Sequence, residues 1–315
     1  MTHRSNRVPT TSSVRIWIKR FIFVVAAALL SLAAQRHSFA GSATWSTNPL
    51  SGDWNTAQNW IPHTVPNGST DTASFTTSSR TQLSLSGLFE LGSLNFGSNA
   101  DAFAITTVPS ATLGTVLSIT GSGITNASGQ VQTFLTQFND TFTSGIFFEN
   151  SATAGQMTSF DGAGCVFVFY NSASTGSAVF DVTSGGIFQA SMDSWDNTTA
   201  ADATINASDS AQVNLFDNAT AGNAVFTLTT SAFLTFGDNA TADHAVATWI
   251  GGDAFSGSNI YFSQFASAGE GHFTAVGAST SDEAGSFIQF DGNTTAASGS
   301  LSSTAVLRRI LLVRC

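Results

Sequence analysis

A sequence motif that recurs seven times between Ile146 and Leu301 constrains the fold of this 315-residue chain more than any other feature. Each copy has Thr or Ser two positions before a shared position, which we call the anchor, and an apolar residue nine positions before it. The anchors, spaced 21, 25, 21, 21, 26 and 28 residues apart, are Gly155, Gly176, Ala201, Gly222, Asp243, Gly269 and Ala297. Self-similarity at such a period is typical of a solenoid, in which each repeat buries its apolar face only against its neighbours.

Apolar residues alternate with polar ones on both sides of a turn in each copy. This alternation predicts two short strands whose apolar side chains face inward. The segment between them, Asp-Asn-Ala-Thr-Ala-Gly in the fourth copy, is rich in residues that tolerate positive φ, which predicts a turn. We therefore expect an all-β fold, a right-handed parallel β-helix (β-solenoid) of about seven coils with an N-terminal β capping segment. The residues that lengthen three of the spacings are expected to form loops at one corner.

Residues 1–40 have the layout of a secretory signal peptide. Basic residues precede an apolar run of 14 residues (21–34), and Ser38-Phe39-Ala40 places small residues where a signal peptidase reads them, so we expect cleavage before Gly41. A membrane anchor is the alternative, but the run is shorter than the about 20 residues that a bilayer requires. The mature chain is thus expected to be exported, to lie outside the cell, on its surface or in the periplasm, and to have no transmembrane helix.

Removing this segment makes the chain strongly acidic. Six of the ten basic residues and none of the twenty acidic ones lie in residues 1–40, so the mature chain would carry 4 − 20 = −16 charges. Between Gly41 and Leu307, Arg80 is the only basic residue. Nucleic acids and anionic lipids require Lys or Arg to neutralise phosphate, so the sequence excludes nucleic acid as a partner. The two cysteines, Cys165 and Cys315, are too few for a disulfide framework.

The remaining chain divides into three segments: 41–143, 144–301 with the repeats, and 302–315. The first contains Trp45, Trp54 and Trp60, which we interpret as buried packing of an N-terminal cap; the alternative is an aromatic platform that binds carbohydrate. The last is a basic, apolar tail, either a short amphipathic cap or out-of-frame sequence after a truncation.

The order of these motifs resembles a known kind of protein. A signal peptide, Trp-…-Ser-Gly-Asp-Trp-…-Asn-Trp-…-Val-Pro-Asn-Gly, Asp-Thr-Ala-Ser-Phe and Phe-x-Asn-x-Ala-Thr-Ala-Gly repeats together resemble bacterial secreted repeat proteins. These are similar to autotransporter passengers and filamentous-haemagglutinin-type parallel β-helices. The resemblance covers about residues 41–301 and implies an exported, surface-associated protein without an enzymatic role. One departure is that autotransporter passengers precede a large C-terminal membrane barrel, for which this chain has no room.

Residues with catalytic chemistry do not form a recognisable constellation. A pectate-lyase-type mechanism requires an Arg or Lys base, which the repeats lack. An inverting glycosidase requires two carboxylates about 6.5–9.5 Å apart, but the acidic residues here mostly follow the repeat, as structural residues do. The three histidines of the mature chain, His63, His244 and His272, lack metal-ligand spacing. We therefore expect no catalytic residues, no cofactor and no enzymatic activity.

The polar position five residues before each anchor has two interpretations, one of which is a metal site. In a parallel β-helix equivalent positions stack about 4.8 Å apart, so Asp196, Asp217 and Asp238 would form a column of carboxylates. Either a bound Ca²⁺ relieves their repulsion, or they lie in a solvated turn and accept backbone N–H bonds. The Thr or Ser two positions before the anchor is expected to bond the backbone of the turn instead of ordering ice.

The sequence thus favours a non-catalytic, exported β-solenoid that acts as a surface scaffold, adhesin-like, with glycans or other surface proteins as partners. A carbohydrate-binding surface protein is the alternative, and a polysaccharide-active β-helix enzyme is a third hypothesis.

Overall fold

The computed structural model describes residues 41–185, 189–250, 257–276 and 287–303. The predicted signal peptide and residues 304–315 of the basic tail lie outside the described residues. No α-helix occurs in the described part of the chain, which contains strands and one 3-10 helix, Ala57–Asn59. The all-β prediction is therefore confirmed.

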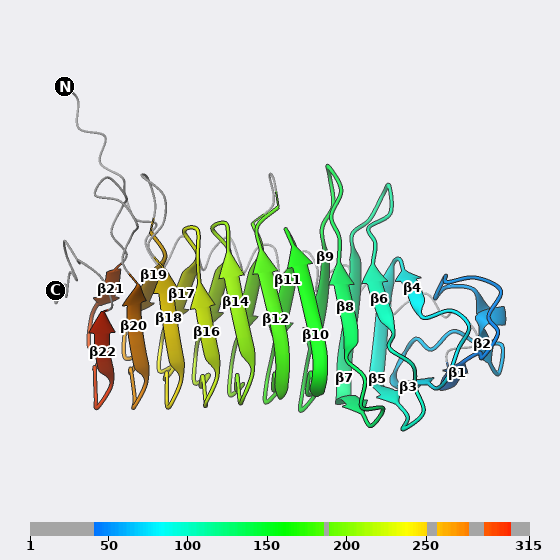
Figure 1. Cartoon of the computed structure of the whole chain (residues 1–315), viewed down its shortest axis with the longest axis horizontal. Helices are drawn as coiled ribbons and strands as arrows, with labels where there is room; N and C mark the ends of the chain where they lie inside the picture. The colour runs from blue at the N-terminus through cyan, green and yellow to red at the C-terminus, as the bar shows by residue number, and fades with distance from the viewer. Residues whose placement is uncertain (1–40, 186–188, 251–256, 277–286, 304–315) are drawn as a thin grey trace. The chain divides into compact units, whose positions relative to one another are not determined.

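The strands form two sheets, and the chain alternates between them (Figure 1). We call the 12-stranded one sheet A. Its order is β2 (Trp60–Ile61), β1 (Ala43–Trp45), β3 (Gly68–Phe75), β5 (Leu88–Phe96), β7 (Thr115–Asn126), β9 (Ser144–Phe148), β11 (Val166–Phe169), β13 (Ser191–Ser194), β15 (Gln212–Leu215), β17 (Phe233–Phe236), β19 (Asn259–Phe262) and β21 (Phe287–Phe290).

The 10-stranded sheet, sheet B, contains the even-numbered strands from β4 onward. Its order is β4 (Gln82–Leu85), β6 (Ala104–Thr107), β8 (Gln132–Thr136), β10 (Gln156–Ala163), β12 (Ser177–Thr183), β14 (Thr204–Ser208), β16 (Val225–Leu228), β18 (Val246–Ile250), β20 (His272–Val276) and β22 (Ser300–Ser303). Every neighbouring pair in sheet B is parallel, and so is each pair in sheet A except β1 with β2. Parallel strands that alternate between two sheets make a β-solenoid.

The solenoid has about nine turns, more than the seven coils that the repeats predict. The strands that precede the seven repeats, β3 to β8, lie in residues 68–136, within the segment assigned from sequence to a cap and first strands. They lack the Asn/Asp–Thr–Gly turn of the later coils, so only their strand alternation is visible in the sequence.

The core lies between the sheets and follows the predicted strand parity. Apolar residues nine positions before the anchors are partners in one register and at most 2% exposed: Ile146, Phe167, Met192, Val213, Leu234, Ile260 and Ile288. Coil spacing also sets the stacking of aromatic rings. Phe148 and Phe169 stack with centroids 4.8 Å apart and planes 6° apart, and Phe236 stacks on Phe262 at 4.7 Å.

One coil departs from the regular register. A bulge between Gln156 and Ser159 shifts β10, and Met157 within it has a φ of 52°. Because the bulge adds a residue, Phe160, five positions after the anchor, is the register partner of Phe180, which lies four positions after its own anchor. The bulge therefore keeps a large aromatic side chain in the core.

The three longer spacings between anchors all fall at one junction of the coil. The additional residues lie between a strand of sheet B and the following strand of sheet A, after β12, β18 and β20. They include residues 186–188, 251–256 and 277–286, which lie outside the described residues. The predicted position at one corner agrees with this order, although the loops themselves are not described.

Candidate functional site

Each repeat turn contains two residues in the left-handed backbone region. The position five before the anchor has φ between 56° and 76° in every described coil: Asn150, Asn171, Asp196, Asp217, Asp238, Gln264 and Gly292. The seven anchors have φ between 42° and 86°. Gly adopts this region freely and Asn and Asp adopt it more readily than other residues, which explains their recurrence at these positions. The turn motif therefore recurs mainly because the backbone at these two positions requires residues that tolerate positive φ.

The carboxylate column bonds the backbone of the preceding coil. The Asp196 carboxylate accepts a hydrogen bond from the Asn171 N–H at 2.9 Å. Asp217 in turn accepts from the Asp196 N–H at 3.4 Å, and Asp238 accepts from the Asp217 N–H at 3.3 Å. At the end of the column, Gln264 Oε1 accepts from the Asp238 N–H at 2.7 Å. These bonds match the interpretation of the column as a turn that accepts N–H groups.

The same column was the predicted calcium site. Within the described ranges, no three His, Cys, Asp or Glu side chains group closely enough to hold a metal ion. Asp196, Asp217 and Asp238 are thus stacked as predicted, one per coil, but each directs a carboxylate oxygen to a backbone N–H.

The Thr and Ser residues two positions before the anchors form a third ladder. Single-residue parallel bridges connect Gly123, Thr153, Ser174, Thr199, Thr220, Thr241, Ser267 and Thr295. Each hydroxyl also accepts a hydrogen bond from the N–H of its own anchor, for example Thr153 Oγ1 from Gly155 at 3.1 Å and Thr241 Oγ1 from Asp243 at 3.1 Å. The hydroxyl is therefore used inside the turn, as the sequence predicted.

The three tryptophans of the cap are buried. Trp45 is 1% exposed, and Trp54 and Trp60 are 0% exposed. The Trp60 ring packs edge-on against both others, with centroids 5.1 Å from Trp45 and 4.6 Å from Trp54, and its Nε1 donates to the Trp54 carbonyl at 2.8 Å. A platform for sugar rings requires an exposed indole face, which none of the three has. The cap interpretation fits this geometry and the carbohydrate site at these residues does not.

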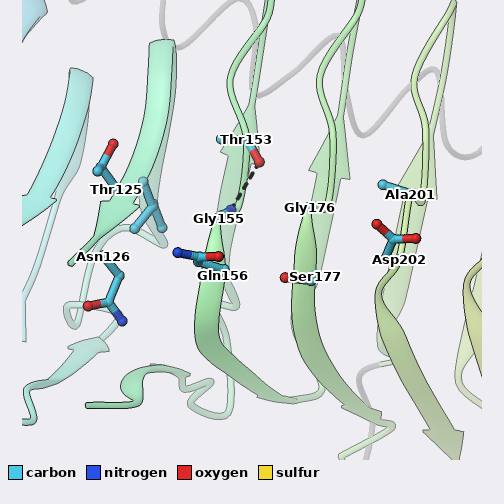
Figure 2. A pocket seen from close by; sticks show the side chains of 10 residues that line it. Thr125, Asn126, Thr153, Gly155, Gln156, Gly176, Ser177, Ala201 and Asp202 are labelled. Atoms are coloured by element: carbon cyan, nitrogen blue, oxygen red, sulfur yellow. Dashed lines mark hydrogen bonds between the residues drawn. The ribbon is translucent and has the colours of Figure 1, made fainter. Parts of the chain in front are cut away.

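A surface pocket crosses the anchor corner of successive coils (Figure 2). Figure 2 shows side chains from neighbouring coils along it, with the Thr153 hydroxyl bonded to the Gly155 N–H. A side chain on Gly176 would place its Cβ 2.3 Å from the Gly155 carbonyl oxygen, so glycine is needed for the coils to approach. The pocket is lined by Ile124, Thr125, Asn126, Thr153, Gly155, Gln156, Gly176, Ser177, Ala201 and Asp202.

Most residues that line this pocket are polar, and Asp202 supplies its single carboxylate. Asp202 Oδ1 accepts a hydrogen bond from Asn223 Nδ2 at 2.9 Å. Asn126 donates to the carbonyls of Gln130 and Met157 at 2.8 and 3.0 Å. None of the lining residues is His, Cys, Lys or Arg, and a two-carboxylate hydrolysis needs a second acid. The pocket residues therefore hold the coils together and do not form an acid–base pair.

Two acidic positions outside the turns were missed by sequence reasoning. Asp193 on β13 is 5% exposed and accepts hydrogen bonds from Asn214 Nδ2 at 2.8 Å and Ser191 Oγ at 2.9 Å. Burial raises the pKa of Asp193 to about 6, although these two bonds oppose the shift. Strand alternation alone assigns Asp193 to the outer side of sheet A, and nothing in the sequence signals its burial.

The second position is a pair of carboxylates on sheet B. Asp161 and Asp181 are register partners on β10 and β12, and Asn206 Nδ2 donates to Asp181 Oδ1 at 2.7 Å. Burial, and after it the neighbouring Asp181 charge, raises the pKa of Asp161 above its ordinary value. Neither residue lines the pocket of Figure 2. This pair is the best candidate for the third hypothesis, a polysaccharide-active enzyme.

Comparisons of the chain with protein-family models, curated proteins and solved structures found no match. The resemblance to autotransporter passengers therefore stays a prediction that depends on sequence motifs alone. In the described part of the chain, no helix has the length and apolar character needed to cross a membrane.

Proposed function

We propose that this chain is an exported, non-catalytic β-solenoid that acts as a surface scaffold, adhesin-like, with glycans or other surface proteins as partners. The observation that carries the proposal is the hydrogen bonding of the repeat-locked polar residues. Asp196, Asp217 and Asp238 accept N–H bonds from the preceding coil, and the Thr and Ser ladder bonds its own turns. Repetition of these residues is explained by coil stacking and does not require a substrate.

A solenoid of this kind is suited to spanning distance. Each parallel coil adds about 4.8 Å of length, and stability is approximately a sum of contacts between adjacent coils. Repetition therefore extends the molecule without a larger core. The acidic surface of the mature chain, with a charge of −16 by the count above, favours solubility and disfavours binding to anionic lipid or nucleic acid.

Export is tested by expressing the whole chain in a bacterium that secretes proteins. Mass spectrometry of the purified protein should give an N-terminus at Gly41, and protease added to intact cells or to the culture fluid should reach it. A protein that stays in the cytoplasm and keeps residues 1–40 would refute the proposed export.

The non-catalytic assignment is tested on the purified protein with neutral and acidic polysaccharides. We expect no release of reducing ends from any substrate, whereas release that is lost in Asp161→Asn or Asp181→Asn would establish the enzyme hypothesis instead. Binding to immobilised glycans is measured in parallel. Retention of the protein on a glycan would identify glycans as the partner class. Retention on an immobilised surface protein, with no retention on any glycan, would identify surface proteins instead.

A further inference from the structure

Eight asparagines of the chain are followed two positions later by Ser or Thr, with no proline between them. This Asn-x-Ser/Thr motif is the acceptor sequence for glycosylation of the asparagine side chain, which takes place on surface segments. The eight are Asn67, Asn126, Asn139, Asn197, Asn206, Asn218, Asn239 and Asn293. Their surroundings in the fold separate them into two groups.

Four of the eight share one position of the repeat turn, four residues before the anchor. We call them the turn asparagines: Asn197, Asn218, Asn239 and Asn293. All four are exposed. Each donates its backbone N–H to a carbonyl of the preceding coil, as Asn218 does to Asp196 at 2.8 Å, so this position recurs at the same corner of successive coils.

The side chains of three turn asparagines also form an amide ladder. Asn218 Nδ2 donates to Asn197 Oδ1 at 3.3 Å, and Asn239 Nδ2 donates to Asn218 Oδ1 at 3.3 Å. An asparagine Nδ2 has two hydrogens, and the ladder bond uses one of them. A sugar that replaces the other hydrogen leaves the ladder bond in place. Stacking and glycosylation of these side chains are therefore compatible.

Two other copies of the motif are held within the fold. Asn126 is 4% exposed, and its Nδ2 donates to the carbonyls of Gln130 and Met157 at 2.8 and 3.0 Å. Both of its amide hydrogens are thus used. Asn206 is half-buried on β14, and its Nδ2 donates to Asp181 Oδ1 at 2.7 Å. A sugar on either nitrogen would disrupt these contacts.

The last two copies lie before the repeats and contact other backbone segments. Asn67 Oδ1 accepts a hydrogen bond from the Glu90 N–H at 2.9 Å. Asn139 Nδ2 donates to the Ser110 carbonyl at 3.0 Å. Neither residue lies in the stacked turn, so only the turn asparagines combine exposure with a repeated geometry.

We propose that the turn asparagines are N-glycosylated, so that the repeats present a row of sugars along one corner of the solenoid. The partner is a glycosyltransferase, and the donor is a sugar whose anomeric carbon is esterified to a nucleotide diphosphate or a lipid diphosphate. Nδ2 forms a bond to the anomeric carbon and loses one proton to a base of the transferase. The bond between that carbon and the diphosphate oxygen breaks, and the diphosphate leaves with the electron pair. This inference is independent of the proposed function.

The test is mass spectrometry of peptides from the protein purified from the organism that encodes it. Cleavage before aspartate places the turn asparagines and Asn206 in five different peptides. We expect the peptides of the turn asparagines to be heavier than their sequence by the mass of a sugar, and the peptide of Asn206 to have its unmodified mass. A single sugar per site indicates a nucleotide-linked donor, and an oligosaccharide of constant mass indicates a lipid-linked one.

Asn218→Gln should remove the sugar completely from the peptide that begins at Asp217, because glutamine does not complete the acceptor motif. The matched control is Asn223→Gln in the same peptide. Asn223 is also exposed and donates from Nδ2 to Asp202 Oδ1 at 2.9 Å, but it has no Ser or Thr two positions later. Its replacement should leave the sugar unchanged.

Three results would overturn the inference: unmodified turn asparagines, equal modification of Asn206, or a sugar that persists in Asn218→Gln. The same digest gives the N-terminus of the protein, which reports on export. A chain that begins at Gly41 and has no sugar on the turn asparagines would therefore refute glycosylation and leave the proposed export standing.

Discussion

We expect Phe226→Ala to destabilise the coil that contains β16 by about 3–5 kcal/mol. Phe226 is 0% exposed and is the register partner of Ile205 in the preceding coil and Ala247 in the following one. Because Ala247 is small, no neighbouring side chain on that side can expand into the space that the ring leaves. The cavity therefore persists, which places the cost in the upper part of this range.

Thr227→Ala is the matched control on the same strand. Thr227 is half-buried and points to the outer face of sheet B, so its truncation should cost well under about 1 kcal/mol. Both variants retain the backbone pairing of β16 with β14 and β18, and they differ only in the direction of the side chain.

Denaturant unfolding gives the two free energies, and hydrogen exchange gives their location. Coils of a solenoid contact only adjacent coils, so Phe226→Ala should increase exchange in β14, β16 and β18 while Trp54 and the cap remain protected. Equal cost at Phe226 and Thr227 would mean that the strand register is wrong. Loss of protection that includes the cap would refute the local, one-dimensional stability.

Three other predictions concern the polar residues and the turns. Burial raises the pKa of Asp193 to about 6 from an ordinary 3.8, so the folded state binds the Asp193 proton more tightly than the unfolded state does. The resulting stability is present below about pH 4 and is lost as pH rises through 6. Asp193→Asn should therefore increase the free energy of unfolding by up to about 3 kcal/mol at pH 7 and little at pH 4; an equal effect at both would contradict this origin. Chelators should leave the melting temperature of the protein unchanged. Asp217→Asn should not lower the melting temperature, because Asn keeps an acceptor oxygen and tolerates positive φ. A melting temperature that depends on calcium, and loses this dependence in Asp217→Asn, would support the metal site instead. Gly176→Ala should destabilise the protein by about 2 kcal/mol or more, whereas Ala201→Gly, at a φ of 42°, should stabilise it by about 1 kcal/mol. Thermal unfolding that gives the opposite order would refute the requirement for a left-handed backbone at the anchors.

Local patterns in the sequence determined the path of the chain in the repeats. Alternation placed Phe226 inside and Thr227 outside, because successive side chains of a strand point to opposite faces. Turn residues such as Asn171 and Gly176 recur where the backbone has positive φ, which few other residues tolerate. Both signals depend on a few neighbouring residues and are therefore readable from the sequence alone.

The tertiary structure decided every feature that depends on contact between coils. It paired Asp217 with the Asp196 N–H, 21 residues away, and buried Asp193 beside Asn214, so that a carboxylate on an outward position lies away from water. It also placed Trp54 under the first coils, where its ring serves packing and not recognition. Coil register and packing bring together residues that are distant in sequence, and no local pattern encodes which oxygen then meets which N–H group.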